Sequence, residues 1–326
     1  MLRSTRLKNE EFLKYLININ MLRIFTIVCT VFLFFGGPGY YSPRSFKYLW
    51  DIGHIVFFSA LSTLILLDLS TLKKMSFLRQ CVAIVLMTII LGILIELIQA
   101  GTKRTVDILD VIRNLIGTFV AISFWAPANK TVPKSYLRTL QVLTIFMVIV
   151  AFLPFAKAAA DELLTRIQFP VLSDFETPFE IDRWSGSGNL SIDDEVHFHG
   201  KSSLKVVLKT SNYSGVSLKY FPGNWLNYKH LHLNIFNPLD EPLKIKCRIH
   251  DRRHAEGNQA YNDRFNKSLV LLKGWNQIVI PLEQVENAPK TRKLDLRRVQ
   301  QLSVYVYRLP HPRVIYIDKI SLTNSP

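Results

Sequence analysis

One segment of the chain combines acids, amides and arginine with an otherwise apolar background. It runs from Gly92 to Gly117 as GILIELIQAGTKRTVDILDVIRNLIG. Ionisable groups are costly to bury among apolar residues, so they usually pair with one another or line a wet cavity, and they are candidates for function. Carboxylates near an imidazole can exchange protons, and an arginine can hold an anion such as phosphate.

The spacing of the polar residues predicts that they share helix faces. A glutamate and a glutamine three residues apart end one apolar run, and two aspartates and an asparagine at i, i+3 and i+7 begin the next. An aspartate and a histidine three residues apart begin an earlier run. Arg104 and Arg113 are the expected charge partners. The candidate catalytic cluster consists of Asp51, His54, Glu96, Gln99, Arg104, Asp107, Asp110 and Asn114.

Part of this pattern has a second explanation. Asp107 and Asp110 fall in the first turn of an expected helix, where the positive end of the helix dipole stabilises carboxylates. This explanation does not extend to His54 and Glu96, which have no capping role. Both interpretations therefore stay open.

At these residues the sequence resembles the VanZ-like family of bacterial membrane proteins. The family pattern E-x-x-Q, then R-x-x-D-x-x-D, then N-x-x-G occurs here in that order and ends at Gly117, with a D-x-x-H element before it. The lysine that often follows the aspartate of that element is Ile52 here. The resemblance covers roughly residues 20–126. It implies a four-helix membrane domain of the bacterial envelope, connected in the family's namesake with tolerance of a glycopeptide antibiotic, and no agreed biochemical activity.

Long apolar runs must position these polar residues. Each run approaches or reaches the roughly 20 residues that a helix needs to cross a bilayer. In lipid, a helix satisfies its own backbone groups. We therefore predict an all-α polytopic membrane bundle of about five transmembrane helices, with a soluble helical bundle as the alternative. The expected spans are residues 21–37, 52–69, 78–98, 107–126 and 138–157.

Basic residues between these runs predict the orientation of the chain. The formal net charge is +15, and most lysines and arginines of the short loops fall on the side of the N-terminus. The positive-inside rule then places the N-terminus in the cytoplasm and, with five spans, the C-terminal half outside. We expect a multi-pass protein of the inner (cytoplasmic) membrane. Because the charge lies between apolar runs, we expect no nucleic-acid partner.

From about Phe169 the sequence changes to short alternating runs, such as SLKVVLKT, LKIKCRIH and LSVYVY. Period-two alternation indicates half-buried antiparallel strands. We predict an all-β jelly-roll or β-sandwich domain. The chain then divides into a cytoplasmic segment 1–20, a helical membrane domain 21–126, a fifth helix with linker 127–168, and the β-sandwich 169–326.

Three motifs make the second half similar to the carbohydrate-binding-module branch of the galactose-binding-like jelly rolls. They are DFETPFEIDRW, LLKGWNQIVIPL and VIYIDKISL, and they mark structural positions more than a ligand site. In similar modules an aspartate of the last strand helps to hold a structural calcium ion, and the resemblance assigns that role to Asp318. Calcium needs six to eight oxygen ligands. A strand-end cap is the alternative role for one aspartate.

The most polar long segment of this half is HDRRHAEGNQAYNDRFN, residues 250–266, between two expected strands. Sugar recognition combines an aromatic platform with planar polar groups, and loops often carry binding residues. The candidate glycan residues are Trp225, Asp251, Tyr261, Asn262 and Arg264. His250 and His254 are spaced i, i+4 but have no third ligand in the sequence, so we expect solvated histidines.

Three functions stay open at this point. The favoured one is a cell-envelope protein whose exported domain binds glycan, since the chain has no nucleophile motif, P-loop or dinucleotide fingerprint. The second is an enzyme of the membrane surface whose polar cluster acts on a lipid-linked envelope substrate. The third is transport or proton coupling. The expected partners are a lipid bilayer and a glycan or lipid-linked ligand. The oligomeric state is not predicted, and calcium is the one cofactor considered.

Overall fold

The computed structural model describes residues 19–33, 36–39, 41–100 and 108–325, apart from the side chains of residues 96, 99 and 100. The chain divides into two units, Met1–Ala159 and Ala160–Pro326. The division falls within one long helix, and each unit is considered by itself.

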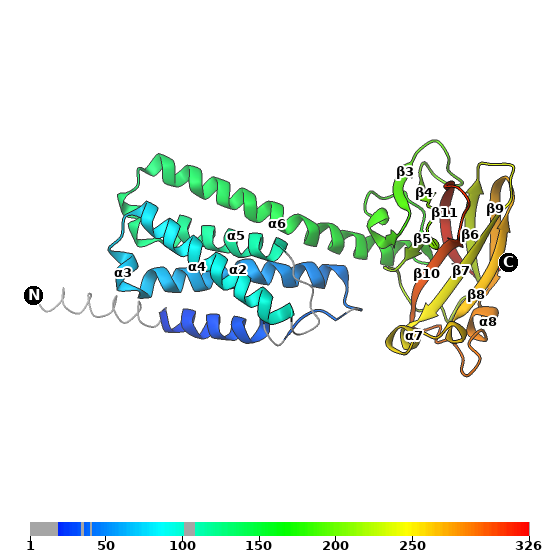
Figure 1. Cartoon of the computed structure of the whole chain (residues 1–326), viewed down its shortest axis with the longest axis horizontal. Coiled ribbons are helices and arrows are strands. Elements are labelled where there is room, and N and C mark those ends of the chain that lie inside the picture. Colours follow the sequence, from blue (N-terminus) through cyan, green and yellow to red (C-terminus); the bar gives the residue numbers. More distant parts are fainter. Residues whose placement is uncertain (1–18, 34–35, 40, 101–107, 326) are drawn as a thin grey trace, which may run out of the picture. The chain divides into compact units, whose positions relative to one another are not determined.

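The first unit is built from apolar helices (Figure 1). Among the described residues, four helices are long and apolar enough to cross a membrane, which is typical of a membrane protein. They are α2 (Arg44–Asp68), α4 (Phe77–Ala100), α5 (Ile108–Trp125) and α6 (Lys134–Gln168). The helix Ile19–Leu33 is apolar but shorter. Two short elements connect the long helices, α3 (Ser70–Lys73) and the 3₁₀ helix η1 (Pro127–Thr131).

The helix boundaries differ from the expected spans where polar residues extend a helix. α2 begins at Arg44 rather than near residue 52, directly after Pro43. α6 continues to Gln168 rather than ending near residue 157. Its last part, KAAADELLTRIQ, consists largely of strong helix formers, so the helix persists after the apolar run stops. The first expected span corresponds to the helix Ile19–Leu33, which adjoins residues outside the described ranges.

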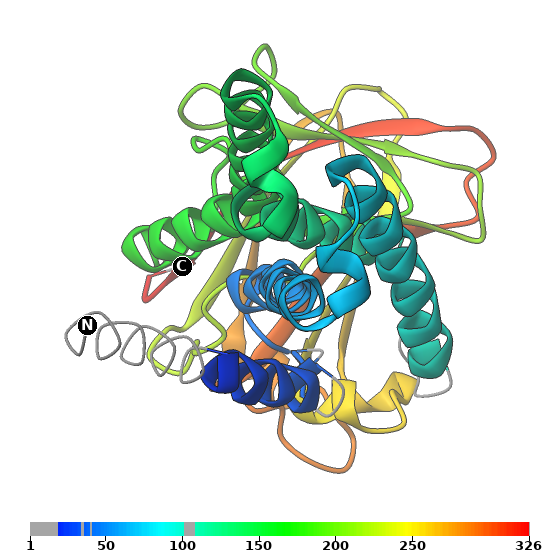
Figure 2. The same cartoon turned by 90° about the vertical axis from the view of Figure 1, so that its left-hand side faces the viewer.

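The helices of this unit pack closely at a glycine. A Cβ atom at Gly117 of α5 would lie 2.4 Å from the carbonyl oxygen of Ile55 and 2.9 Å from the amide nitrogen of Ser59, both on α2. Small residues of this kind let membrane helices approach one another. The helix Ile19–Leu33 lies beside α2 in both views (Figures 1 and 2). There Arg23 donates to Asp68 at 2.7 Å.

The second unit is an antiparallel β-sandwich with jelly-roll connections, as predicted. Sheet A has the strand order β3-β4-β11-β6-β9, with β1 also paired to β11, and sheet B has the order β2-β5-β10-β7-β8. From β4 onward most connections cross from one sheet to the other.

The strands of the two sheets have the following bounds. Sheet A contains β1 (Val171–Ser173), β3 (Asn189–Asp193), β4 (Ser203–Leu208), β6 (His230–Asn237), β9 (Gly274–Pro281) and β11 (Arg313–Thr323). Sheet B contains β2 (Trp184–Gly186), β5 (Tyr213–Leu218), β7 (Leu243–Asp251), β8 (Phe265–Leu271) and β10 (Val299–Tyr307). Short helices lie between strands: η2 (Glu180–Arg183), α7 (Arg252–Glu256), η3 (Tyr261–Asp263) and α8 (Leu282–Glu286).

Apolar side chains from alternate positions of the strands fill the space between the sheets. The buried apolar residues of β7 include Ile245, Cys247 and Ile249, and those of β10 include Leu302, Val304 and Val306. The intervening side chains of both strands therefore lie on the outer face of sheet B.

The motif DFETPFEIDRW contributes buried charged side chains to the fold, in agreement with its structural interpretation. The Glu180 carboxylate is fully buried and accepts backbone hydrogen bonds from Asp174 and Phe175, each at 2.9 Å. Arg183 is also fully buried, with its Nη2 atom 2.7 Å from the carboxylate of Asp161 in the last turns of α6. Each buried charge has hydrogen-bonding partners, which offset the cost of removing it from water.

We expect Gly117→Ala to destabilise the first unit by about 1–3 kcal/mol, because the new methyl group would overlap the α2 backbone. The measurement is the thermal unfolding midpoint of the detergent-solubilised protein by circular dichroism. Gly53→Ala is the matched control, since its methyl group would meet only Leu33, at an ordinary 3.7 Å. An equal midpoint for Gly117→Ala and the unsubstituted protein would contradict the close packing.

Candidate functional site

A cluster of polar side chains joins α2 to α5 inside the first unit. The Nδ1 atom of His54 lies 3.0 Å from the Oδ1 atom of Asn114, and its Nε2 atom lies 3.7 Å from Asp110. His54 and Asn114 are both buried. On the same side of α5, Arg113 pairs with Asp110 and, at 3.2 Å, with Asp51. The spacing of these residues thus places five polar groups in one connected network.

Hydroxyl groups extend this network into the apolar part of the unit. The Oγ1 atom of Thr118, one turn after Asn114, donates to the Asn114 carbonyl oxygen at 3.1 Å. It also lies 3.0 Å from the hydroxyl of Ser62 on α2 and 2.7 Å from that of Thr88 on α4. We did not predict these three hydroxyl residues as part of the site. The available signal was the i, i+4 spacing of Thr118 from Asn114.

The other predicted members of the cluster cannot be placed in the network. Glu96 and Gln99 belong to the end of α4, but their side chains lie outside the described residues. Arg104 and Asp107 also lie outside the described ranges. Their participation stays a prediction. The described members can orient an imidazole between an amide oxygen and a carboxylate, which suits proton exchange. The same ion pairs also satisfy charges that would be costly to leave alone in an apolar bundle.

A second candidate site is a cavity of about 550 Å³ over sheet B of the second unit. This volume is in the range of ligand pockets. Its lining combines aromatic rings, cations and neutral hydrogen-bonding groups. The rings are Tyr213, Tyr261, Tyr305 and Tyr307, the cations are Lys246, Arg248 and Arg264, and the neutral polar groups include Ser217, Gln301 and Ser303.

The strand register brings these side chains together on the outer face. Tyr307 of β10 stands opposite Tyr213 of β5, and Tyr305 stands opposite Gly215. On the other side of β10, Ser303 stands opposite Arg248 of β7, and Tyr305 opposite Lys246. The cavity therefore has hydroxyl and tyrosine groups on β5 and β10, and cations on β7.

Three tyrosines of the cavity form an aromatic group, in which Tyr213 and Tyr307 are exposed and Tyr305 is half-buried. Tyr213 is 63% exposed, and its ring centroid lies 6.0 Å from that of Tyr305 and 5.2 Å from that of Tyr307. A Cβ atom at Gly215 would lie 2.2 Å from the carbonyl oxygen of Val304 and 2.5 Å from the Cβ atom of Tyr305, so a side chain there would collide with β10 at the base of this ring. Exposed aromatic rings on a sheet face can serve as platforms for flat apolar surfaces.

Neutral polar groups lie beside this aromatic group. The hydroxyls of Ser217 and Ser303 are 2.9 Å apart, and the amide nitrogen of Gln301 donates to both at 2.9 Å. At the other side of the cavity, the guanidinium of Arg264 lies 5.3 Å from the ring centroid of Tyr261. The site thus offers hydrogen-bonding groups next to stacking surfaces.

The predicted glycan residues have different positions in the structure. Tyr261 and Arg264 line the cavity, whereas Asn262 is exposed but does not line it. Trp225 is fully buried in the core, so its ring cannot act as a surface platform, and this assignment is corrected. Asp251 is also fully buried and its carboxylate binds Arg292, which corrects its assignment as a ligand residue. Sequence reasoning missed the outward residues of β5, β7 and β10, although their alternation was visible.

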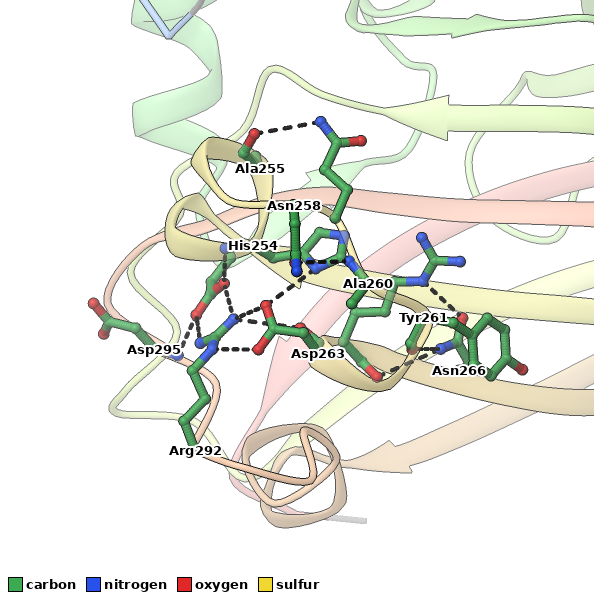
Figure 3. A network of polar contacts seen from close by, with 12 residues as sticks. His254, Ala255, Asn258, Ala260, Tyr261, Asp263, Asn266, Arg292 and Asp295 are labelled. Carbon is green, nitrogen blue, oxygen red and sulfur yellow. Dashed lines mark hydrogen bonds and ion pairs between the residues drawn. The ribbon is translucent and has the colours of Figure 1, made fainter.

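Arg292 connects the polar segment after β7 to the neighbouring loop (Figure 3). Its guanidinium donates to both carboxylate oxygens of Asp251, at 2.5 and 2.9 Å, and to both of Asp263, at 2.6 and 2.9 Å. Burial alone would raise the pKa of Asp251, but hydrogen bonds from Arg292 and from the amides of Asp295 and His254 lower it below its usual value. Hydrogen bonds from Arg292 likewise lower the pKa of Asp263.

His250 and His254 are buried rather than solvated, which corrects that expectation. Their ring centroids are 4.9 Å apart, and the Nδ1 atom of His254 lies 3.3 Å from Asp263. Burial lowers the pKa of His250 to about 3, and repulsion from Arg248 adds to this. Burial also lowers the pKa of His254. Both imidazoles are therefore neutral at pH 7. Among the described residues, no group of three or more His, Cys, Asp or Glu could hold a metal ion.

Asp318 of β11 holds a loop through backbone hydrogen bonds. Its Oδ2 atom accepts from the amides of Phe198 and His199, at 2.6 and 2.8 Å. The Oδ1 atom is buried without a hydrogen-bond partner, and burial raises the pKa of this carboxyl. Among the described residues, Asp318 does not belong to any group of three or more His, Cys, Asp or Glu that could hold a metal ion. Calcium also takes backbone and amide oxygens as ligands, so a structural calcium ion at Asp318 stays a prediction.

No protein-family model matches the chain, and no curated protein matches it. Solved structures similar to its second half include the family 11 carbohydrate-binding module from Clostridium thermocellum in complex with a β-1,3-1,4-mixed-linked tetrasaccharide. That module is 17% identical over 48% of this chain and 95% of its own, with a TM-score of 0.36.

An exo-β-agarase is also similar, with 17% identity over 48% of this chain, 25% of its own and a TM-score of 0.39. The chain thus spans about a quarter of the length of that enzyme.

We expect Arg292→Ala to destabilise the second unit by about 3 kcal/mol, because it leaves the buried Asp251 carboxylate without its cation. The measurement is hydrogen–deuterium exchange of the β7 and β8 amides in the full chain. Lys293→Ala is the control, since Lys293 is exposed and pairs with Glu286 at 3.4 Å.

The effect of Arg292→Ala should depend on pH. Because the folded-state pKa values of Asp251 and Asp263 are lowered, the stabilisation is complete above about pH 4 and is lost as the pH falls further. The difference between the variant and the unsubstituted protein should therefore shrink below about pH 4. A constant difference down to pH 3 would contradict this account.

Proposed function

We propose that the protein is a membrane-anchored carbohydrate-binding protein of the bacterial envelope, with the sugar chain held in the cavity over sheet B. The observation that carries this proposal is the group of exposed tyrosines beside the Ser217, Ser303 and Gln301 network. A pyranose ring has an apolar face that stacks on an aromatic ring and hydroxyls at its rim that need donors and acceptors. The cavity lining offers both kinds of group within one open site.

The four apolar helices hold this domain at a membrane in the proposed protein. The distribution of basic loop residues supports an orientation with the N-terminus in the cytoplasm and the β-sandwich outside. This orientation would put the cavity among the polysaccharides of the cell envelope. The inner membrane is the membrane we propose.

We expect Tyr213→Ala to weaken glycan binding about tenfold, because a stacking surface is lost. The full chain, in phosphatidylcholine bilayer discs without sugar-based detergent, is titrated with soluble polysaccharides by biolayer interferometry. Tyr213→Phe keeps the ring and should retain most of the affinity. Tyr220→Ala, which removes a half-buried tyrosine outside the cavity, should leave affinity unchanged. If no polysaccharide binds the intact protein, or if Tyr213→Ala binds as well as the original, the proposal fails.

A second function is favoured by the network around His54. We propose that it is a VanZ-like membrane-surface site that exchanges protons with a lipid-linked envelope substrate. The supporting observation is the buried imidazole between Asn114 and Asp110, with Arg113 next to it as a cation for a phosphate group. Glu96, Gln99, Arg104 and Asp107 are further proposed members.

We expect His54→Gln and Asp110→Asn to abolish any glycopeptide tolerance that the chain confers on expressing cells, because both remove a proton-exchanging group. Minimum inhibitory concentrations are measured at matched membrane levels of protein. Asp68→Asn is the control, since Asp68 belongs to an ion pair with Arg23 outside this network. Full tolerance in both cluster variants would remove the basis for the second function.

A further inference from the structure

The charged residues that line the cavity over sheet B are all cations. Its lining contains three cations, Lys246, Arg248 and Arg264, and none of the lining residues that the structure describes is acidic. Lys246 and Arg248 occupy successive outward positions of β7, and Arg264 directly precedes β8. The cavity is therefore a region of positive potential.

The carboxylates closest in sequence to these cations are bound elsewhere. Asp251 and Asp263 both accept hydrogen bonds from Arg292. Arg264 instead donates its Nε hydrogen to the neutral Asn266 at 3.2 Å. In the part of the chain that the structure describes, neither Lys246 nor Arg264 forms an ion pair with a carboxylate. Their charge is thus available to a ligand.

The positive charge of these cations also affects the neighbouring histidines. Burial lowers the pKa of both His250 and His254, and repulsion from Arg248 and Arg264 lowers each further. Burial disfavours a charge of either sign, but the repulsion from Arg248 and Arg264 acts on cations alone and would attract an anion.

We infer that the carbohydrate held in this cavity is an acidic polysaccharide, one that carries carboxylate, sulfate or phosphate groups along its chain. This inference rests on the proposed glycan-binding function and specifies its ligand. The tyrosines on β5 and β10 stack on the sugar rings, while Lys246, Arg248 and Arg264 face the acidic substituents on the opposite side. Guanidinium groups suit carboxylate and phosphate oxygens because they donate in a planar fork.

The layout of the cavity favours a glycan over a nucleic acid. A nucleic acid presents a regular line of phosphates, which calls for a basic track along the whole site. Here the lining cations lie on β7 and beside β8, and the β5 and β10 side presents tyrosine rings and hydroxyls. A polysaccharide that carries acidic groups on some of its sugar rings fits this separation of cations from tyrosines and hydroxyls.

The test uses the full chain in phosphatidylcholine bilayer discs and a matched pair of probes. Polygalacturonate and its fully methyl-esterified form have the same sugar backbone and differ in charge. Alginate and heparin extend the acidic set, xylan and mixed-linked β-glucan extend the neutral set, and a single-stranded thymidine oligonucleotide tests the nucleic-acid alternative. We expect at least one acidic polysaccharide to bind about tenfold or more tightly than every neutral one and than the oligonucleotide.

Charge-removing variants then locate the binding. Lys246→Gln combined with Arg248→Gln and Arg264→Gln should weaken acidic-probe binding about tenfold or more. The triple control Lys209→Gln, Lys229→Gln and Lys290→Gln removes equal charge from exposed positions outside the cavity and should change affinity by less than about twofold. If the cavity triple does not fold, the single variant Lys246→Gln replaces it. The loss of acidic-probe affinity between 50 and 500 mM NaCl in the unsubstituted protein gives a second measurement.

The outcomes separate this inference from the function on which it rests. Equal or tighter binding of neutral polysaccharides, weakened by Tyr213→Ala but not by loss of the cavity cations, would overturn the acidic ligand and leave glycan binding intact. Tightest binding of the oligonucleotide would overturn the acidic polysaccharide as ligand. Binding of no polysaccharide at all would overturn both.

Discussion

The strands of sheet B must place apolar side chains in the core at every second position, and only the intervening positions remain for a ligand. On β7, Ile245, Cys247 and Ile249 are buried, and Lys246 and Arg248 lie between them on the outer face. On β10 the tyrosines alternate with buried valines in the same way. A shift of one residue in register would exchange core and cavity. The chemistry of the strand-borne part of the cavity is therefore tied to the packing of the sandwich, while Tyr261 and Arg264 come from the segment between β7 and β8.

In the helical unit, the controlling constraint is the cost of burying charge. Arg113 lies between Asp110 and Asp51, and Asp110 also faces His54, so each charged group has a partner on a neighbouring helix or turn. The close approach at Gly117 keeps α2 and α5 near enough for these contacts. Any chemistry at His54 would thus use groups that also hold the helices together. Isosteric substitutions separate these roles better than truncations do, because they keep the packing.

The sequence predicted the general architecture well because the long apolar runs of the first half differ clearly from the period-two alternation of the second half. Long apolar runs identified the helices, and alternation such as LKIKCRIH identified the strands. The predicted helix ends were less accurate. At α6, for example, helix-forming polar residues continue the helix after the apolar run has ended. The spacing of Asp51 and His54, and of Asp110 and Asn114, predicted that each pair shares a helix face, and the structure places these residues in contact across α2 and α5. Their role as a functional site stays a prediction. The cavity over sheet B was not anticipated, since it depends on which strands are neighbours. Tyr213 and Tyr305 are far apart in sequence, and their meeting follows from the pairing of β5 with β10.

The polar segment 250–266 shows why polarity alone is a poor guide to a binding site. We expected ligand contacts from Asp251, Tyr261, Asn262 and Arg264. Asp251 instead binds Arg292 and caps α7 at the His254 amide, Asp263 also binds Arg292, and the His254 ring is buried. A loop between strands has backbone and charged groups that must be satisfied before it can adopt one conformation. Most of the polar groups here serve that purpose. The two residues of this segment that line the cavity, Tyr261 and Arg264, lie on either side of Asp263 in the sequence, so the ion pair between Asp263 and Arg292 helps to hold the aromatic and cationic edge of the cavity in position.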